Sequence, residues 1–166
     1  PITSLMPLVA KDLLSGNATL YGSLLGAFGL GSVLAAFTST RQRLALGNEN
    51  IILLATTASA IGAATLAMVQ AKMLVLGAAF LGGYAWTTTM ATMNVGIQMR
   101  ADEWVLGRTL SMYAGAGFAG VSLGAYVFGR IADNFGVVTA LISSAMFLTL
   151  SLGLSIVAPT PDRRKE

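Results

Sequence analysis

The sequence contains no cysteine and no histidine, and only 10% of its 166 residues are charged. Without these two residue types the chain has no disulfide, no thiolate nucleophile, no imidazole base and none of the usual zinc ligands. These absences exclude the most common hydrolytic and metal-dependent chemistries. We therefore expect a protein that is not an enzyme, with no catalytic residue, no metal site and no cofactor.

The scarcity of charge is matched by an excess of apolar residues, which make up 55% of the chain. A soluble domain carries about 25% charged residues, so this composition predicts a polytopic, all-α membrane protein whose surroundings are a lipid bilayer. Nineteen glycines suit membrane helices that pack closely. The net charge of +3 comes from basic residues placed singly or near helix ends, so no nucleic-acid partner is expected.

Apolar runs of sufficient length divide the chain into one short N-terminal piece and five complete spans. The piece at residues 1–14 is too short to cross a bilayer and opens with Pro1 inside an apolar run. It is interpreted as a truncated helix, preceded by a missing N-terminal part of the protein. A loop is predicted through Asn48–Asn50 and a solvated tail at 159–166. The predicted spans are residues 18–40, 51–69, 73–99, 109–129 and 137–158.

Basic residues are distributed unequally between the two sides of these spans. Cytoplasmic loops of membrane proteins are enriched in Lys and Arg, so this asymmetry predicts a cytoplasmic C-terminus. One side carries Lys11, Lys72 and Arg130, whereas the side of the C-terminus carries Arg41, Arg43, Arg100, Arg108, Arg163, Arg164 and Lys165.

The stretch Met73–Met99 is the strongest functional candidate, because it has no charged residue yet contains many polar ones. At roughly 100° per residue, one arc of about 80° holds Tyr84, Thr87, Ala91, Asn94 and Gln98. Amides cost several kcal/mol in hydrocarbon unless they are hydrogen-bonded, so this arc does not face lipid. The candidate substrate-binding residues are Tyr84, Thr87, Thr88, Asn94 and Gln98.

Two interpretations of the arc stay open. It is either interhelical glue or the polar wall of a cavity for a small-molecule substrate. Phe80 shares the arc and Met90 borders it, which suits a partly apolar ligand. Thr89 lies on the opposite side of the helix and provides an internal control.

Glycines form two further patterns. Gly22 and Gly26 make a GxxxG pair, and Gly120 and Gly124 continue a small-residue stripe, so these four are predicted to mediate helix packing. Residues 115–120 also match a dinucleotide-binding fingerprint, and residues 120–124 match a nucleophile elbow. Both motifs require a preceding strand, and the elbow also requires a base, so inside apolar spans they favour packing.

Several stretches together carry a family resemblance. They are LMPLVAKDLL at 5–14, YGSLLGAFG at 21–29, NVGIQ at 94–98, EWVLGRTL at 103–110 and GRIADNFG at 129–136. On these stretches the chain resembles the C-terminal half of a major facilitator superfamily transporter. More narrowly, it is similar to the bacterial secretion-effector branch that includes enterobactin exporters.

This resemblance implies that the N-terminal piece is helix seven and that the five spans are helices eight to twelve. Met73–Met99 then corresponds to cavity-lining helix ten, and helices eight and eleven contact the missing N-terminal half. The implied function is alternating-access export of a small organic molecule, such as a siderophore or drug-like compound, across the bacterial cytoplasmic membrane. A non-transporting membrane scaffold or assembly protein remains the alternative.

The chain departs from the superfamily in its loop signature, G-x-x-x-D-R-x-G-R-R. After the first complete span only Arg41 and Arg43 remain, without the acidic partner. Gly129 to Gly136 match the front of the signature but lack its terminal basic pair. The gating role of that loop is therefore not assigned to either segment.

Overall fold

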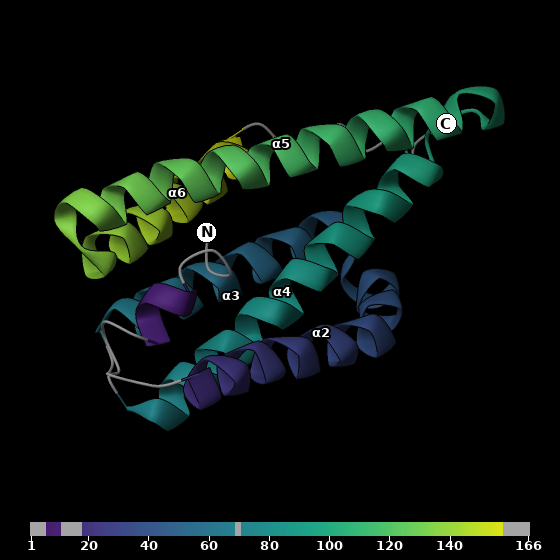
Figure 1. The fold of residues 1–166 in the computed structure, drawn as a ribbon. Coiled ribbons are helices and arrows are strands. Elements are labelled where there is room, and N and C mark those ends of the chain that lie inside the picture. Colours follow the sequence, from purple (N-terminus) through teal and green to yellow (C-terminus); the bar gives the residue numbers. More distant parts are fainter. Residues whose placement is uncertain (1–5, 11–17, 69–70, 158–166) are drawn as a thin grey trace.

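The computed structural model describes residues 6–10, 18–68 and 71–157 and is helical almost throughout them (Figure 1). Residues 6–10 are helical and are the described part of the predicted N-terminal piece. The remainder of 1–14 and the predicted tail at 159–166 lie outside the described residues. The all-α prediction is confirmed for the part described. The long helices are α2 (Ala18–Leu46), α3 (Asn48–Met68), α4 (Lys72–Gln98), α5 (Glu103–Phe135) and α6 (Val137–Val157).

Two glycines with positive φ set the sharpest turns. Gly47 has φ of 81° and separates α2 from α3, and its N–H donates to the Arg43 carbonyl at 3.0 Å. Gly136 has φ of 87° and separates α5 from α6 in the same way, with a 2.9 Å bond to Ala132. Glycine adopts this left-handed conformation without a Cβ penalty, so each helix stops and the next begins after one residue.

The helices extend beyond the apolar spans expected from the sequence. The loop predicted through Asn48–Asn50 is wrong, because these residues form the first turn of α3. Helix α5 begins at Glu103 rather than near residue 109, and it continues to Phe135. Charged residues at the two ends of a span interrupt the apolar run, but they do not interrupt backbone hydrogen bonding. The helices are therefore longer than the apolar runs.

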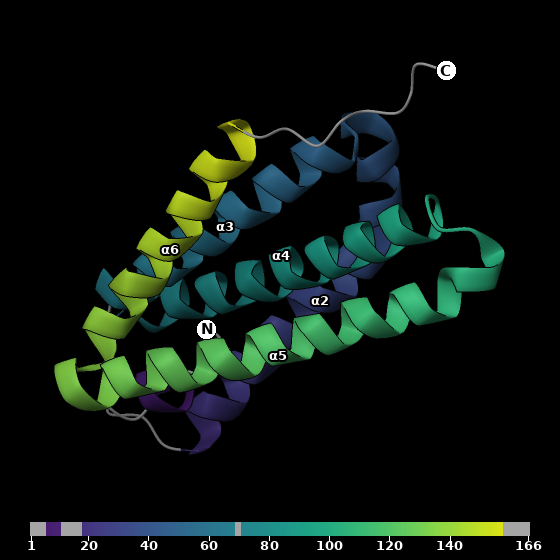
Figure 2. The ribbon, with the colours of Figure 1, turned by 90° about the horizontal axis from the view of Figure 1, so that it is seen from above.

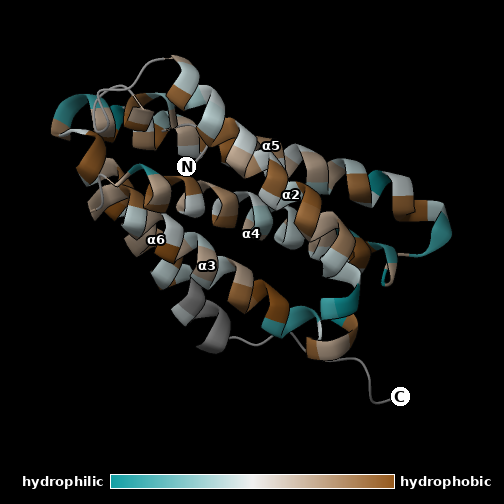
Figure 3. Ribbon diagram, turned by 90° about the horizontal axis from the view of Figure 1, so that it is seen from below, coloured by the Kyte–Doolittle hydropathy of each residue, from teal (hydrophilic) through white to brown (hydrophobic). Residues whose placement is uncertain are grey.

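Within the described residues, α2, α3, α4 and α5 are each long and apolar enough to cross a membrane. The described part of α6 contributes a shorter apolar segment, Val137–Ser151. Helices satisfy their backbone hydrogen bonds internally, which is what a hydrocarbon environment requires. Figure 3 shows hydrophilic residues concentrated toward the turns and apolar residues along the helices. The structure is that of a polytopic helical membrane protein.

Helix α4 lies at the centre of the arrangement (Figures 1 and 2). Its most extensive contacts are with α2 and α3, while α6 packs on α3 and less extensively on α5. Helix α5 meets α4 only sparingly and has Ala132 as its one buried described residue. Helix α5 is therefore left largely exposed beside the unit formed by α2, α3 and α4.

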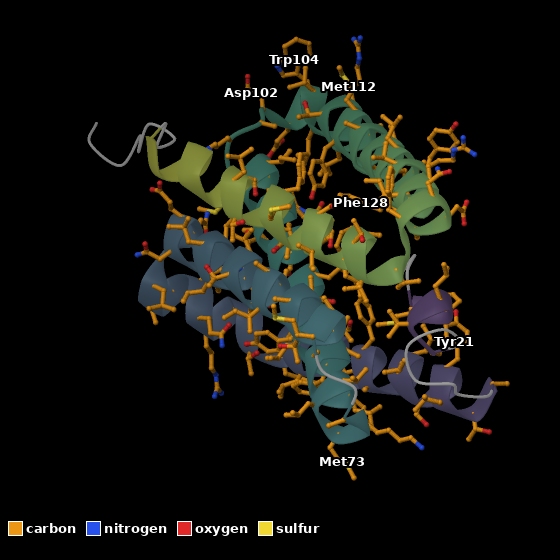
Figure 4. All side chains as sticks on the ribbon, turned by 90° about the vertical axis from the view of Figure 1, so that its left-hand side faces the viewer. Tyr21, Met73, Asp102, Trp104, Met112 and Phe128 are labelled. Carbon is orange, nitrogen blue, oxygen red and sulfur yellow. The ribbon has the colours of Figure 1, made fainter. Side chains whose placement is uncertain are left out.

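The main apolar cluster, called the apolar core here, lies at one end of the bundle. Tyr21 and Phe128 pack against it from its edges, and both are labelled in Figure 4. Because the helices alternate in direction, the end of α3, the start of α4, the end of α5 and the start of α6 all meet there. The buried members are Met6, Val9, Ala10, Leu24, Ala63, Leu66, Val75, Ala78, Ala79, Ala132, Val137, Ala140 and Leu141.

The closest helix contact joins α2 to α4 through two glycines. A Cβ built on Gly31 would overlap the Phe80 backbone carbonyl, and a Cβ on Gly83 would overlap the Phe28 carbonyl. The Ser32 hydroxyl adds a hydrogen bond to the Gly83 carbonyl at 3.2 Å. The two backbones therefore touch in a reciprocal contact that only glycine permits.

The glycines expected to mediate packing make no such contact. A Cβ at Gly22, Gly26, Gly120 or Gly124 meets no described atom within 4 Å outside its own surroundings on the helix. The spacing of small residues identifies a smooth face, but a neighbouring helix must cover that face before packing occurs. A packing role for these four glycines therefore requires a partner other than the described helices.

We predict that Gly83→Ala lowers thermal stability and that Gly22→Ala does not. The added methyl at Gly83 meets backbone, which cannot move aside as a side chain can, so the cost is about 1–3 kcal/mol. Thermal unfolding of the detergent-purified chain measures the difference. Equal melting temperatures for the two variants would contradict the reciprocal contact.

Candidate functional site

The five candidate residues all lie on the second half of α4, but the structure separates their surroundings. Tyr84 is half-buried against α2, and its Oη lies 2.9 Å from Thr38 Oγ1. Thr38 donates its single hydroxyl proton to the Leu34 carbonyl at 2.8 Å, so Tyr84 is the donor in this pair. Tyr84 therefore joins two helices, as the glue interpretation of the polar arc expects.

Thr88 is buried, with 1% of its surface exposed. Its Oγ1 has no hydrogen-bond partner among the described residues, although most helical threonines here bond the carbonyl four residues earlier. The Thr88 carbonyl instead accepts the hydroxyl of Thr92 at 2.7 Å. An unpaired buried hydroxyl costs about 1–3 kcal/mol, so Thr88 retains unused hydrogen-bonding capacity inside the bundle.

Thr87, Asn94 and Gln98 are the open members of the polar face. Thr87 and Asn94 are half-buried and Gln98 is exposed. Within the described ranges, none of the three side chains makes a hydrogen bond to protein. Their hydroxyl and amide groups are therefore available to water or to a ligand, in contrast to the paired hydroxyl of Tyr84. The control residue Thr89 is half-buried, and its hydroxyl bonds the Ala85 carbonyl at 2.9 Å.

Helix α2 holds this part of α4 in place through an arginine near its C-terminal end. Arg43 Nη1 donates to the Ala91 carbonyl at 3.0 Å, one turn from Asn94, and Nη2 donates to Thr40 Oγ1 at 3.1 Å. Together with the Ser32 and Tyr84 bonds, this contact joins α2 to α4 along much of their length. The sequence indicates only a charged residue at the end of a span for Arg43, not this contact with α4.

A cavity of about 740 Å³ lies on the other face of α4. It is bounded by the first turns of α3, the last turns of α4 and the first turns of α5, at the opposite end of the bundle from the apolar core. Helix α4 contributes Thr92, Met93, Gly96 and Ile97, none of which was predicted as a site residue. None of the five predicted substrate-binding residues lines it.

The sequence contained one signal for this second face. Gly96 lies on the side of α4 opposite the polar arc, and Tyr113 and Thr109 line the same cavity from α5. Tyr113 Oη donates a hydrogen bond to Met90 Sδ at 3.5 Å and so joins α5 to α4. No group of His, Cys, Asp or Glu residues in the described part of the chain is placed to hold a metal ion.

Comparison with known proteins gives one match. The family model described as "Transmembrane secretion effector" matches residues 1–166, which is the whole chain. No curated protein and no solved structure matches the chain.

We predict a measurable coupling between Tyr84 and Thr38. Tyr84→Phe and Thr38→Val each remove the hydrogen bond between Tyr84 and Thr38. The double variant should therefore lose less unfolding free energy than the sum of the two single losses. The coupling energy should be about 0.6 kcal/mol, the average for hydrogen bonds between membrane helices. Denaturation of the four proteins in mixed micelles gives the cycle, and strictly additive losses would show that the pair contributes nothing.

Proposed function

The chain belongs to the transmembrane secretion effector family of the major facilitator superfamily, and we propose that it forms one half of a secondary active exporter. The cargo is a small organic molecule, such as a siderophore or a drug-like compound. Transport proceeds by alternating access, with the described helices forming one wall of the path. The N-terminal piece and α2 to α6 then correspond to helices seven to twelve of the superfamily.

The observation that carries this proposal is the set of unpaired polar groups on α4. Thr87, Asn94 and Gln98 make no side-chain hydrogen bond to the described residues, although they lie on a helix that is long and apolar enough to cross a membrane. Structural glue needs a partner on a neighbouring helix, as Tyr84 has in Thr38. Groups without such a partner are suited to hydrate a pathway or to orient a cargo by a few hydrogen bonds.

The open glycine faces fit the same proposal. Gly22 and Gly26 on α2, and Gly120 and Gly124 on α5, have free space where a Cβ would be added. In the proposed transporter these faces contact the other half of the protein. Smooth faces of this kind let helices approach closely and shift against one another between inward-open and outward-open states.

A membrane scaffold is the second candidate, and the exposure of α5 favours it. Phe118, Leu123 and Tyr126 are each at least 65% exposed, so α5 presents a long apolar face to its surroundings. An assembly protein can use such a face to bind another membrane protein. The polar groups of α4 have no role in that function, which is why export is preferred.

We expect Thr87→Val and Asn94→Leu to impair export without lowering membrane abundance. Each variant removes hydrogen-bonding capacity worth about 0.5–1.5 kcal/mol, so cargo affinity should fall several-fold. Thr89→Val is the matched control, because the Thr89 hydroxyl is already paired with its own helix. The measurement is export activity normalised to protein level in cells that express the complete transporter.

If Thr89→Val is as damaging as Thr87→Val, the polar face has no special function. If the Thr87 and Asn94 variants only reduce abundance, their side chains act in folding. Either outcome would contradict the assignment of the polar face of α4 to the substrate path. Unaltered export in both variants would contradict it as well.

The proposed orientation places the turns at Gly47 and at residues 99–102, together with the C-terminus, in the cytoplasm of a bacterium. It rests on the seven-to-three distribution of basic residues. In this cysteine-free chain, Asn48→Cys should escape an impermeant thiol reagent in intact cells, whereas Asn134→Cys should be labelled. Both positions are exposed, so access to the reagent is limited only by the membrane. The reverse labelling pattern would invert the topology.

A further inference from the structure

The 740 Å³ cavity between α3, α4 and α5 has the size of a small-molecule site. Pockets that bind drug-sized ligands enclose about 300–1,000 Å³ and are lined mainly by apolar side chains. Its location differs from that of the polar face. At 100° per residue, the α4 residues that line it point about 170° away from the centre of the arc that contains Thr87 and Asn94.

The walls of the cavity are apolar over most of their length. Ile52 and Leu53 contribute from α3, Met93 and Ile97 from α4, and Val105 from α5. An aliphatic and thioether surface of this kind adapts to apolar bodies of varied shape. At Gly96 the wall has no side chain, and a Cβ built there meets no described atom within 4 Å outside its own helix surroundings. The absence of that side chain keeps the cavity open.

Charged residues gather at one end of the cavity. Asp102 precedes α5 and Glu49 lies in the first turn of α3, and both are exposed. Figure 4 shows Asp102 and Trp104 together at this end of α5. Tyr113 lines the cavity eleven residues further along, about 16 Å away at 1.5 Å per residue of helix. The cavity thus runs from a charged mouth to a mainly apolar interior that also carries the hydroxyls of Thr92, Thr109 and Tyr113.

The two carboxylates at the mouth are not engaged elsewhere in the described structure. Asp102 occupies the N-cap position, yet its side chain makes no capping hydrogen bond. No ion pair or side-chain hydrogen bond joins Glu49 or Asp102 to any described residue. Arg100 also lines the mouth and is likewise without an ion pair there, so two carboxylates face one guanidinium.

We propose that this cavity binds an amphiphilic organic cation. The apolar body of the ligand lies between α3, α4 and α5, and its cationic group lies between Glu49 and Asp102. An anion of the same shape meets two carboxylates against one guanidinium and is disfavoured, while a small inorganic cation leaves the apolar walls in contact with water. The site does not depend on the proposed export path, because it uses the opposite face of α4.

Binding of tritiated tetraphenylphosphonium to the full chain in lipid nanodiscs tests the proposal. This probe combines a rigid apolar body with one delocalised positive charge. Saturable binding is expected for the unaltered chain. Tetraphenylborate, which has the same shape and the opposite charge, should neither bind saturably nor compete.

Gly96→Leu should abolish saturable binding, because Gly96 lines the cavity and a side chain added there has free space to enter it. Gly77→Leu is the matched control: it lies on the same helix, is exposed, has equally free space around its Cβ and does not line the cavity. Glu49→Gln and Asp102→Asn should each weaken binding roughly threefold, as expected for exposed ion pairs. Arg100→Gln should leave the affinity unchanged or raise it.

Several results would overturn the proposal. One is unaltered binding in the Gly96→Leu protein, and another is equal binding of tetraphenylborate, which would show unspecific partition into apolar surface. Binding in detergent that disappears in nanodiscs would assign the cavity to lipid. Binding that appears only after residues 159–166 are deleted would assign the cavity to the basic C-terminal segment of the chain itself.

Discussion

The backbone contact between α2 and α4 is the interaction on which the other features of this structure depend. Gly31 and Gly83 each place a bare α-carbon against a carbonyl of the partner helix. In a bilayer there is no hydrophobic driving force between apolar helices, so association relies on close packing and interhelical hydrogen bonds. The reciprocal glycine contact supplies the first, and the bonds of Ser32, Tyr84 and Arg43 supply the second.

Once α4 is anchored to α2, its other faces are determined. The side turned toward α3 carries alanines and glycines, and Gly62 of α3 approaches the Ala78 carbonyl closely enough that a Cβ would lie 3.3 Å from it. Further along α4, the helices separate, and the space between α3, α4 and α5 widens into the cavity. A tightly packed end and an open end are therefore joined by one central helix.

The polar residues of α4 illustrate how one sequence pattern divides into separate structural roles. Tyr84 is paired with Thr38, Thr88 is buried without a partner, and Thr87, Asn94 and Gln98 keep their hydrogen-bonding groups free within the described chain. The glue interpretation therefore fits Tyr84, whereas the three unpaired side chains are the ones on which the proposed substrate path rests. Each side chain's role depends on whether a neighbouring helix offers it a hydrogen-bonding partner, as α2 does for Tyr84.

The sequence by itself determined the class of structure and the family. Long uncharged runs must form helices in a bilayer, because no other open structure satisfies the backbone there, and the quoted motifs indicate the family that the whole chain matches. It did not identify Gly31 and Gly83 as the contact glycines, nor Gly96 and Thr92 as cavity residues. Spacing along a helix shows which residues share a face, whereas the helix that covers that face comes from a distant part of the chain. Only the tertiary structure decided that α2 covers one side of α4 and that the other side opens into a cavity.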